Sequence, residues 1–89
     1  MNNTIKEAIE SEKALEAARE RLWEAKVNLG IHFAQVRQAK GFSQRHTENL
    51  MFAQGFEKRS SVQKIERPRR GVSHKTETIL EALSILETL

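Results

Sequence analysis

The sequence predicts an all-α fold of five helices or so, in which a long N-terminal helix is added to a smaller helical domain. One proline and four glycines among 89 residues leave few breaks, and these fall where helices would end. Strand signals are missing, because the chain has no tyrosine and no run of alternating β-branched residues. At this length we expect one compact domain, residues 29–89, preceded by a helix in residues 1–28.

The first predicted helix runs from Thr4 to about Val27 and is rich in good helix formers such as alanine, glutamate and leucine. Thr4 and Glu7 have the spacing of a capping box. A narrow apolar seam recurs along one face with a seven-residue period, as in helices that pack closely on another helix. The seam comprises Ala8, Ser11, Leu15, Ala18, Leu22, Ala25 and Leu29. We expect its members from Leu15 onward to pair two copies of the chain. The alternatives are binding of another protein and packing on the chain's own domain.

The next predicted helix is Ile31–Lys40, nearly continuous with the first. Gly30 lies between them, but one glycine costs a helix only about 1 kcal/mol and need not break it. Gly41 then has the place of a glycine that terminates a helix. Ser43 is a good N-cap for a short helix covering Gln44 to about Ala53.

Two further helices are predicted in the last third of the chain. The first covers about Lys58–Glu66, and Pro68 stops it because the residue before a proline is disfavoured in the α region. Ser73 or Thr76 is expected to cap the second, an apolar helix that ends near Thr88.

The net charge of +3 is unevenly placed along the chain. Residues 1–28 sum to −1, residues 37–75 carry ten basic and three acidic side chains for a sum of +7, and residues 76–89 sum to −3. A basic middle between acidic ends suggests a contact with a polyanion. The alternative is a solvated positive surface that has no partner.

The middle of the chain resembles the helix-turn-helix of the Cro/repressor (XRE-type) family, which the stretch "SQRHTENLMFAQGFEKRSSVQKIE" matches in outline. The resemblance covers about residues 29–86. Its first block is Leu29, Gly30, Phe33, Arg37, Gly41, Phe42, Ser43 and Gln44. Its second block is Val62, Ile65 and Glu66. The interval between the blocks is longer than in the family, which predicts an extra helical turn or a longer connection.

The resemblance implies binding to double-stranded DNA, with the helix that ends at Glu66 in the major groove. The side chains expected to read bases are Arg59, Ser60, Ser61, Gln63 and Lys64. Those expected to contact phosphates are Gln44, Arg45, Arg67, Arg69 and Arg70. A dimer of such domains would read a palindromic operator.

Arg37 and Glu66 match family positions that form a partly buried ion pair between helices; the alternative is two independent solvated charges. The three histidines lack metal-ligand spacing, so we expect no metal site. Trp23 is expected to pack on a helix or a partner rather than to stack on bases. We expect neither enzymatic activity nor a cofactor, because no nucleophile–base spacing and no glycine-rich phosphate loop is present.

The sequence therefore predicts a small transcriptional regulator, such as a repressor, in the cytoplasm and associated with the nucleoid, with no membrane span. The alternative is a protein-interaction module on the same fold, such as an antitoxin or a regulator that captures another transcription factor. Exposure of the segment from Arg59 to Lys64 would favour DNA binding. Cover by the N-terminal helix would favour the interaction module.

Overall fold

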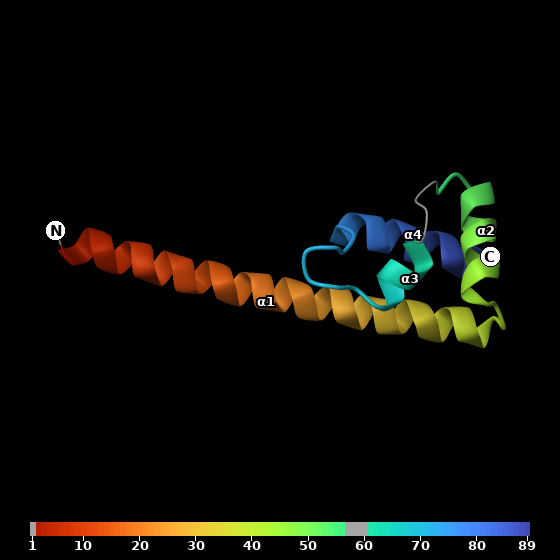
Figure 1. Ribbon diagram of the computed structural model, residues 1–89, viewed down its shortest axis with the longest axis horizontal. Helices are drawn as coiled ribbons and strands as arrows, with labels where there is room; N and C mark the ends of the chain where they lie inside the picture. Colours follow the sequence, from red (N-terminus) through yellow and green to blue (C-terminus); the bar gives the residue numbers. More distant parts are fainter. Residues whose placement is uncertain (1, 57–60) are drawn as a thin grey trace.

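The computed structural model describes residues 2–56 and 61–89, and within them the chain is all-helical. Four helices are present there: α1 Asn2–Ala39, α2 Gln44–Ala53, α3 Ser61–Glu66 and α4 Thr76–Thr88 (Figure 1). The predicted all-α class is confirmed. The count of about five is wrong, because the two helices expected before Gly41 form the single helix α1.

Helix α1 continues through Gly30 because the glycine is needed for packing rather than for a turn. A Cβ atom at this position would overlap the backbone carbonyl oxygen of Ile65 and lie against Glu66. The missing side chain thus lets α3 approach the α1 backbone closely. Contact with α3 offsets the roughly 1 kcal/mol by which glycine disfavours a helix relative to alanine.

Helix α1 spans the length of the molecule, and the other helices gather around its C-terminal half (Figure 1). The longest dimension is 59 Å, close to the roughly 57 Å that 38 helical residues cover at 1.5 Å each. All side chains from Asn3 to Leu22 are exposed. Because α1 begins at Asn2, Thr4 lies inside the first turn, and the predicted capping box at Thr4 is wrong.

One hydrophobic core joins the four helices, and α1 contributes to it with Phe33. The buried core residues are Phe33, Met51, Phe56, Val62, Ile65, Ile79, Ala82, Leu83 and Leu86. Leu29 and Val36 of α1 pack against this cluster from its edge. Leu29 was predicted to belong to the seam that pairs two copies, but it packs against the core of its own chain. The seam turns gradually around α1, so that at Leu29 it faces the core.

The turn between α1 and α2 has the predicted form. Gly41 has a positive φ of 74°, and the amide of Phe42 donates to the carbonyl oxygen of Arg37 at 3.2 Å, which closes the end of α1. Ser43 is the N-cap of α2, and its hydroxyl accepts a hydrogen bond from the amide of His46 at 3.0 Å. The chain thus turns from α1 into α2 over four residues, and α2 runs across the axis of α1 (Figure 1).

Helix α4 begins differently from the prediction. Its N-cap is Lys75, whose backbone is extended and whose side chain makes no capping hydrogen bond, and Thr76 is already helical. Ser73 instead accepts a hydrogen bond from the ammonium group of Lys26 at 3.1 Å. Neither predicted cap is correct, because Ser73 lies two residues before the N-cap and Thr76 is already inside α4.

Candidate nucleic-acid interface

A surface hollow lies between α3 and the loop that follows it. Its described lining carries three cationic side chains and no acidic one. The residues that line it are Gln63, Lys64, Arg67, Pro68, Arg69 and Val72. We call this surface the basic hollow. It brings together two of the predicted base readers, Gln63 and Lys64, with two of the predicted phosphate contacts, Arg67 and Arg69.

The spacing of apolar residues in α3 determines which side chains reach the basic hollow. Val62 and Ile65, three positions apart, are 1% and 0% exposed and hold the inner face of α3 in the core. Gln63 and Lys64 lie between them and are exposed. Pro68 then prevents continuation of the helix, so the basic residues after α3 form a loop beside its outer face.

An ion pair predicted from the resemblance fixes α3 against α1. Arg37 donates from Nε to Glu66 Oε2 at 2.6 Å and from Nη2 to Glu66 Oε1 at 2.9 Å, so the pair is bidentate. Its side chains are only 11% and 6% exposed, which excludes two independent solvated charges. The hydrogen bond to Glu66 raises the pKa of Arg37 above its ordinary value, although burial acts in the opposite direction.

Two further hydrogen bonds tie the same pair to the start of α2. Arg37 Nη1 donates to the carbonyl oxygen of Phe42 at 2.7 Å, and Gln44 Nε2 donates to Glu66 Oε1 at 3.1 Å. Gln44 was predicted to contact a phosphate, but here it completes the network around Glu66. Its carboxamide lies within reach of Glu66 because α2 begins beside the C-terminal end of α3.

Arg70 points away from the basic hollow toward α1. It binds the carboxylate of Glu20 with N–O distances of 2.9 Å, and its guanidinium carbon lies 4.9 Å from the centroid of the Trp23 ring. The hydrogen bond lowers the pKa of Glu20 and raises that of Arg70. Both side chains are more than half exposed, so the pair adds little stability but positions the loop. Arg70 is therefore engaged with α1, and the structure does not present its guanidinium as a free phosphate contact.

The other predicted DNA contacts lie elsewhere. Arg45 is exposed in the first turn of α2 and does not belong to the lining of the basic hollow. Arg59 and Ser60, predicted base readers, lie outside the described residues. Ser61 is the first residue of α3.

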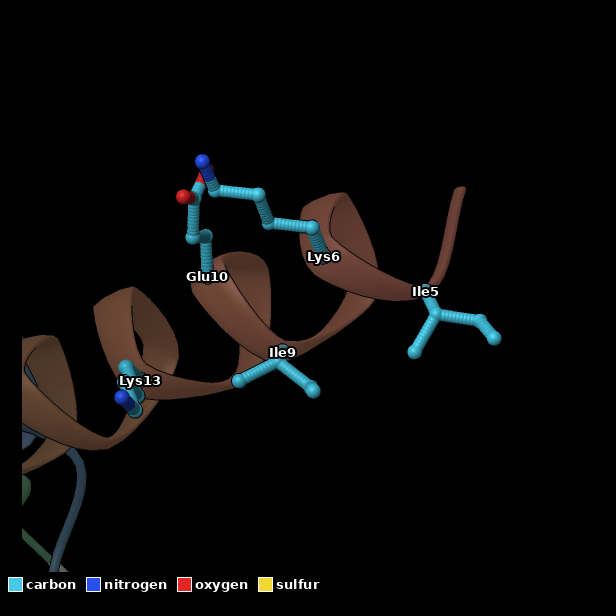
Figure 2. A pocket seen from close by; sticks show the side chains of 5 residues that line it. All are labelled: Ile5, Lys6, Ile9, Glu10 and Lys13. Carbon is cyan, nitrogen blue, oxygen red and sulfur yellow. The ribbon is translucent and has the colours of Figure 1, made fainter. Parts of the chain in front are cut away.

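A second hollow lies near the free end of α1 and is lined by Ile5, Lys6, Ile9, Glu10 and Lys13 (Figure 2). Figure 2 shows that Ile5 and Ile9 project to one side of the helix, while Lys6 and Glu10 rise from another. Its described walls come from one helix, so the hollow is a shallow exposed surface beside Ile5 and Ile9 and does not enclose a ligand. In residues 2–56 and 61–89, no group of three or more histidine or carboxylate side chains is placed to hold a metal ion.

No helix in the described part of the chain is long and apolar enough to cross a membrane. Comparison with protein-family models, curated protein sequences and solved structures finds no match to this chain. Its function is therefore inferred from the basic hollow and from the residues that hold α3 in place.

Proposed function

We propose that this protein is a sequence-specific DNA-binding transcriptional regulator, with α3 as the element that enters the major groove. The basic hollow is the observation that carries the proposal. As a dimer, the protein would read a palindromic operator, one half-site for each copy.

The chemistry of the basic hollow suits duplex DNA. Lys64 can donate to the O6 and N7 acceptors of guanine, and Gln63 can both donate to and accept from adenine. Arg67 and Arg69, on the loop, supply the charge that phosphates attract and set register without reading sequence. A surface that combines amide and cationic donors with no acidic neighbour in its described lining suits both tasks.

The surrounding network supports the proposal by holding the reading surface in place. The Arg37–Glu66 pair fixes α3 to α1, and Gln44 extends the network to α2. On the other side, Arg70 ties the loop to Glu20 of α1. A reading helix and a phosphate loop held this way lose little conformational freedom on binding, which favours affinity.

The alternative function is a protein-interaction module on the same fold. The observation that favours it is the projecting half of α1, where Leu15 and Leu22 are each 49% exposed. Against it, Gln63 and Lys64 are exposed and α1 does not cover them, as DNA reading requires. The interaction module would bind its partner through α1, whereas DNA would bind at the basic hollow, so one experiment on duplex binding separates the two functions.

That experiment selects binding sites from a pool of random duplexes with the full chain, and then compares variants on the selected site and on random DNA. Lys64→Ala should cost about 1–3 kcal/mol on the selected site and relax preference at one base pair. Arg69→Ala should weaken binding to both DNAs alike. Lys13→Ala is the matched control, because it removes the same charge from the projecting half of α1.

Failure to enrich any duplex would overturn the proposal and favour the interaction module. Equal losses for Lys64→Ala on selected and random DNA would show that Lys64 contacts phosphate, and the assignment of α3 as the reading helix would then be wrong.

A further inference from the structure

The projecting half of α1 carries an apolar stripe that its own domain leaves open. The stripe consists of Ala8, Ser11, Leu15, Ala18, Leu22 and Ala25, all of them exposed. The next member of the recurrence, Leu29, packs on the core, so the open stripe ends at Ala25. Helices in water draw most of their stability from packing of an apolar face. From Ala8 to Ala18 this face has no packing partner within the described chain, and Leu22 lines a hollow beside the loop residues Arg70, Gly71 and Ser73.

Charged side chains border the stripe, and their sign changes along the helix. On one border, Glu7 precedes Ala8 and Arg21 precedes Leu22. On the other, Glu12 follows Ser11 and Arg19 follows Ala18. Both borders are therefore acidic toward the N-terminal end of α1 and basic toward the C-terminal end.

This reversal decides which orientation a second copy can adopt. In a parallel pair, a border residue just before one stripe member faces the residue five positions later in the other copy. That residue comes just after a stripe member. Glu7 would then face Glu12 of the second copy, and Arg21 would face its Lys26, so both contacts join like charges. A parallel pair is disfavoured at both ends of the stripe.

We propose that α1 pairs through this stripe with α1 of a second copy in antiparallel orientation. Equivalent borders then face one another at the same five-residue offset, so Glu7 meets Arg21 of the second copy and Glu12 meets its Lys26, while Arg19 meets the Arg19 of the second copy. The two-fold axis repeats the first two contacts, which gives four attractive pairs against the single repulsive Arg19 pair on the axis. Charge complementarity along both borders thus selects a second copy as the occupant.

The same orientation sets the register and the spacing of the two domains. Leu15 packs opposite Ala18 of the second copy and Leu22 opposite its Ser11, so large residues meet small ones and the centre lies between residues 16 and 17. Gly30, where α3 meets α1, is then about 20 Å from the centre at 1.5 Å per residue. The two α3 helices are separated by about 40 Å along the pair, which is more than one DNA turn of roughly 34 Å.

This pairing deepens the dimerisation that accompanies the proposed function, but it does not depend on DNA binding. Its test contains no DNA, so failure of one proposal is distinguishable from failure of the other.

The test is chemical crosslinking of the full chain, which has no cysteine of its own. Ala8→Cys and Ala25→Cys are placed so that the thiol introduced at position 8 of one copy faces the thiol introduced at position 25 of the other in the antiparallel pair. Identical positions are then about 25 Å apart, given 17 residues at 1.5 Å each. With a short bismaleimide, we expect crosslinked dimers when the two variants are mixed and none from either variant alone.

Crosslinking of each variant with itself would show a parallel pair and overturn the proposal. Absence of crosslinks in all three samples, with a monomeric mass at the same concentration, would overturn it as well.

Charge reversal provides an independent readout by sedimentation. Glu7→Arg with Glu12→Arg, or Arg21→Glu with Lys26→Glu, should each weaken self-association at least about tenfold, since four attractive contacts become repulsive. Mixing the two double variants should restore it. Glu10→Arg with Glu16→Arg changes net charge equally away from the stripe and should have little effect. An equal loss in this control would show that net charge, and not the proposed contacts, governs association.

Discussion

Replacing Glu66 by alanine tests the network that holds α3. The substitution removes the two carboxylate oxygens of α3 that accept from the Arg37 guanidinium, one of which also accepts from Gln44. The carbonyl oxygen of Phe42 is then the remaining described partner of Arg37. Arg37 is 9% exposed, so water cannot fully replace the lost carboxylate. A buried charge without its partner is the expected result.

The magnitude follows from this burial. Removing one partner of a buried ion pair costs about 3–5 kcal/mol, because the other charge is left uncompensated. The side chains from Asn3 to Leu22 are exposed, so the cooperative unit is close to residues 23–89. At roughly 0.05–0.15 kcal/mol per residue, a unit of that size has a free energy of unfolding of about 3–10 kcal/mol. Glu66→Ala should therefore remove much of the stability.

The assay is urea unfolding followed by circular dichroism. Glu66→Gln provides a milder variant should the alanine form not fold; it retains one oxygen acceptor and should lose about 1.5–3 kcal/mol, the value of a hydrogen bond to a charged group. Glu20→Ala is the control, because it breaks an exposed ion pair of the same kind and should change stability little. If Glu66→Ala costs no more than the ~1 kcal/mol of an exposed pair, the network does not stabilise α3.

Three further predictions concern local features. Gly30→Ala should lower the free energy of unfolding by about 1–3 kcal/mol in urea despite its better helix propensity, because the new Cβ overlaps a backbone carbonyl of α3; a gain in stability would contradict the close approach. Ser43→Ala should cost about 1 kcal/mol in the same assay through loss of the α2 cap, whereas Ser43→Asp should retain it. Arg70 lowers the pKa of Glu20 below its ordinary 4.5, so the contact is fully stabilising above that pH and is lost as the pH falls through the lowered value. Tryptophan fluorescence should change over that acid range, and the same change in Glu20→Gln would show that another group is responsible.

The features that the sequence predicts correctly depend on few neighbours. Gly41 ends α1 and Ser43 caps α2 because a positive φ and an N-cap hydroxyl are local requirements. The 3-residue interval between Val62 and Ile65 indicates the buried face of α3 for the same reason. The Arg37–Glu66 pair, 29 residues apart in sequence, was predicted only because the resemblance relates the two positions.

Features that depend on contacts between distant segments could not be predicted. Local propensity places a weak point at Gly30, but the passage of α3 over α1 makes a glycine favourable there. Nothing in the sequence relates Arg70 to Glu20 across 50 residues, and the contact removes Arg70 from the predicted phosphate contacts. Ser73 has the residue type of a cap, yet Lys26 of α1 takes its hydroxyl.

The salt dependence of duplex binding tests the proposed DNA function most directly. With about four to six phosphates neutralised per subunit, log Kd against log salt should have a slope of roughly 4–5 for each bound subunit, about 0.9 per phosphate. Arg69→Ala should lower the slope by about one unit per subunit, and Lys13→Ala, which removes an equal charge far from the basic hollow, should leave it unchanged. Binding that is absent, that does not respond to salt, or whose slope falls equally with Lys13→Ala would contradict DNA binding through the basic hollow.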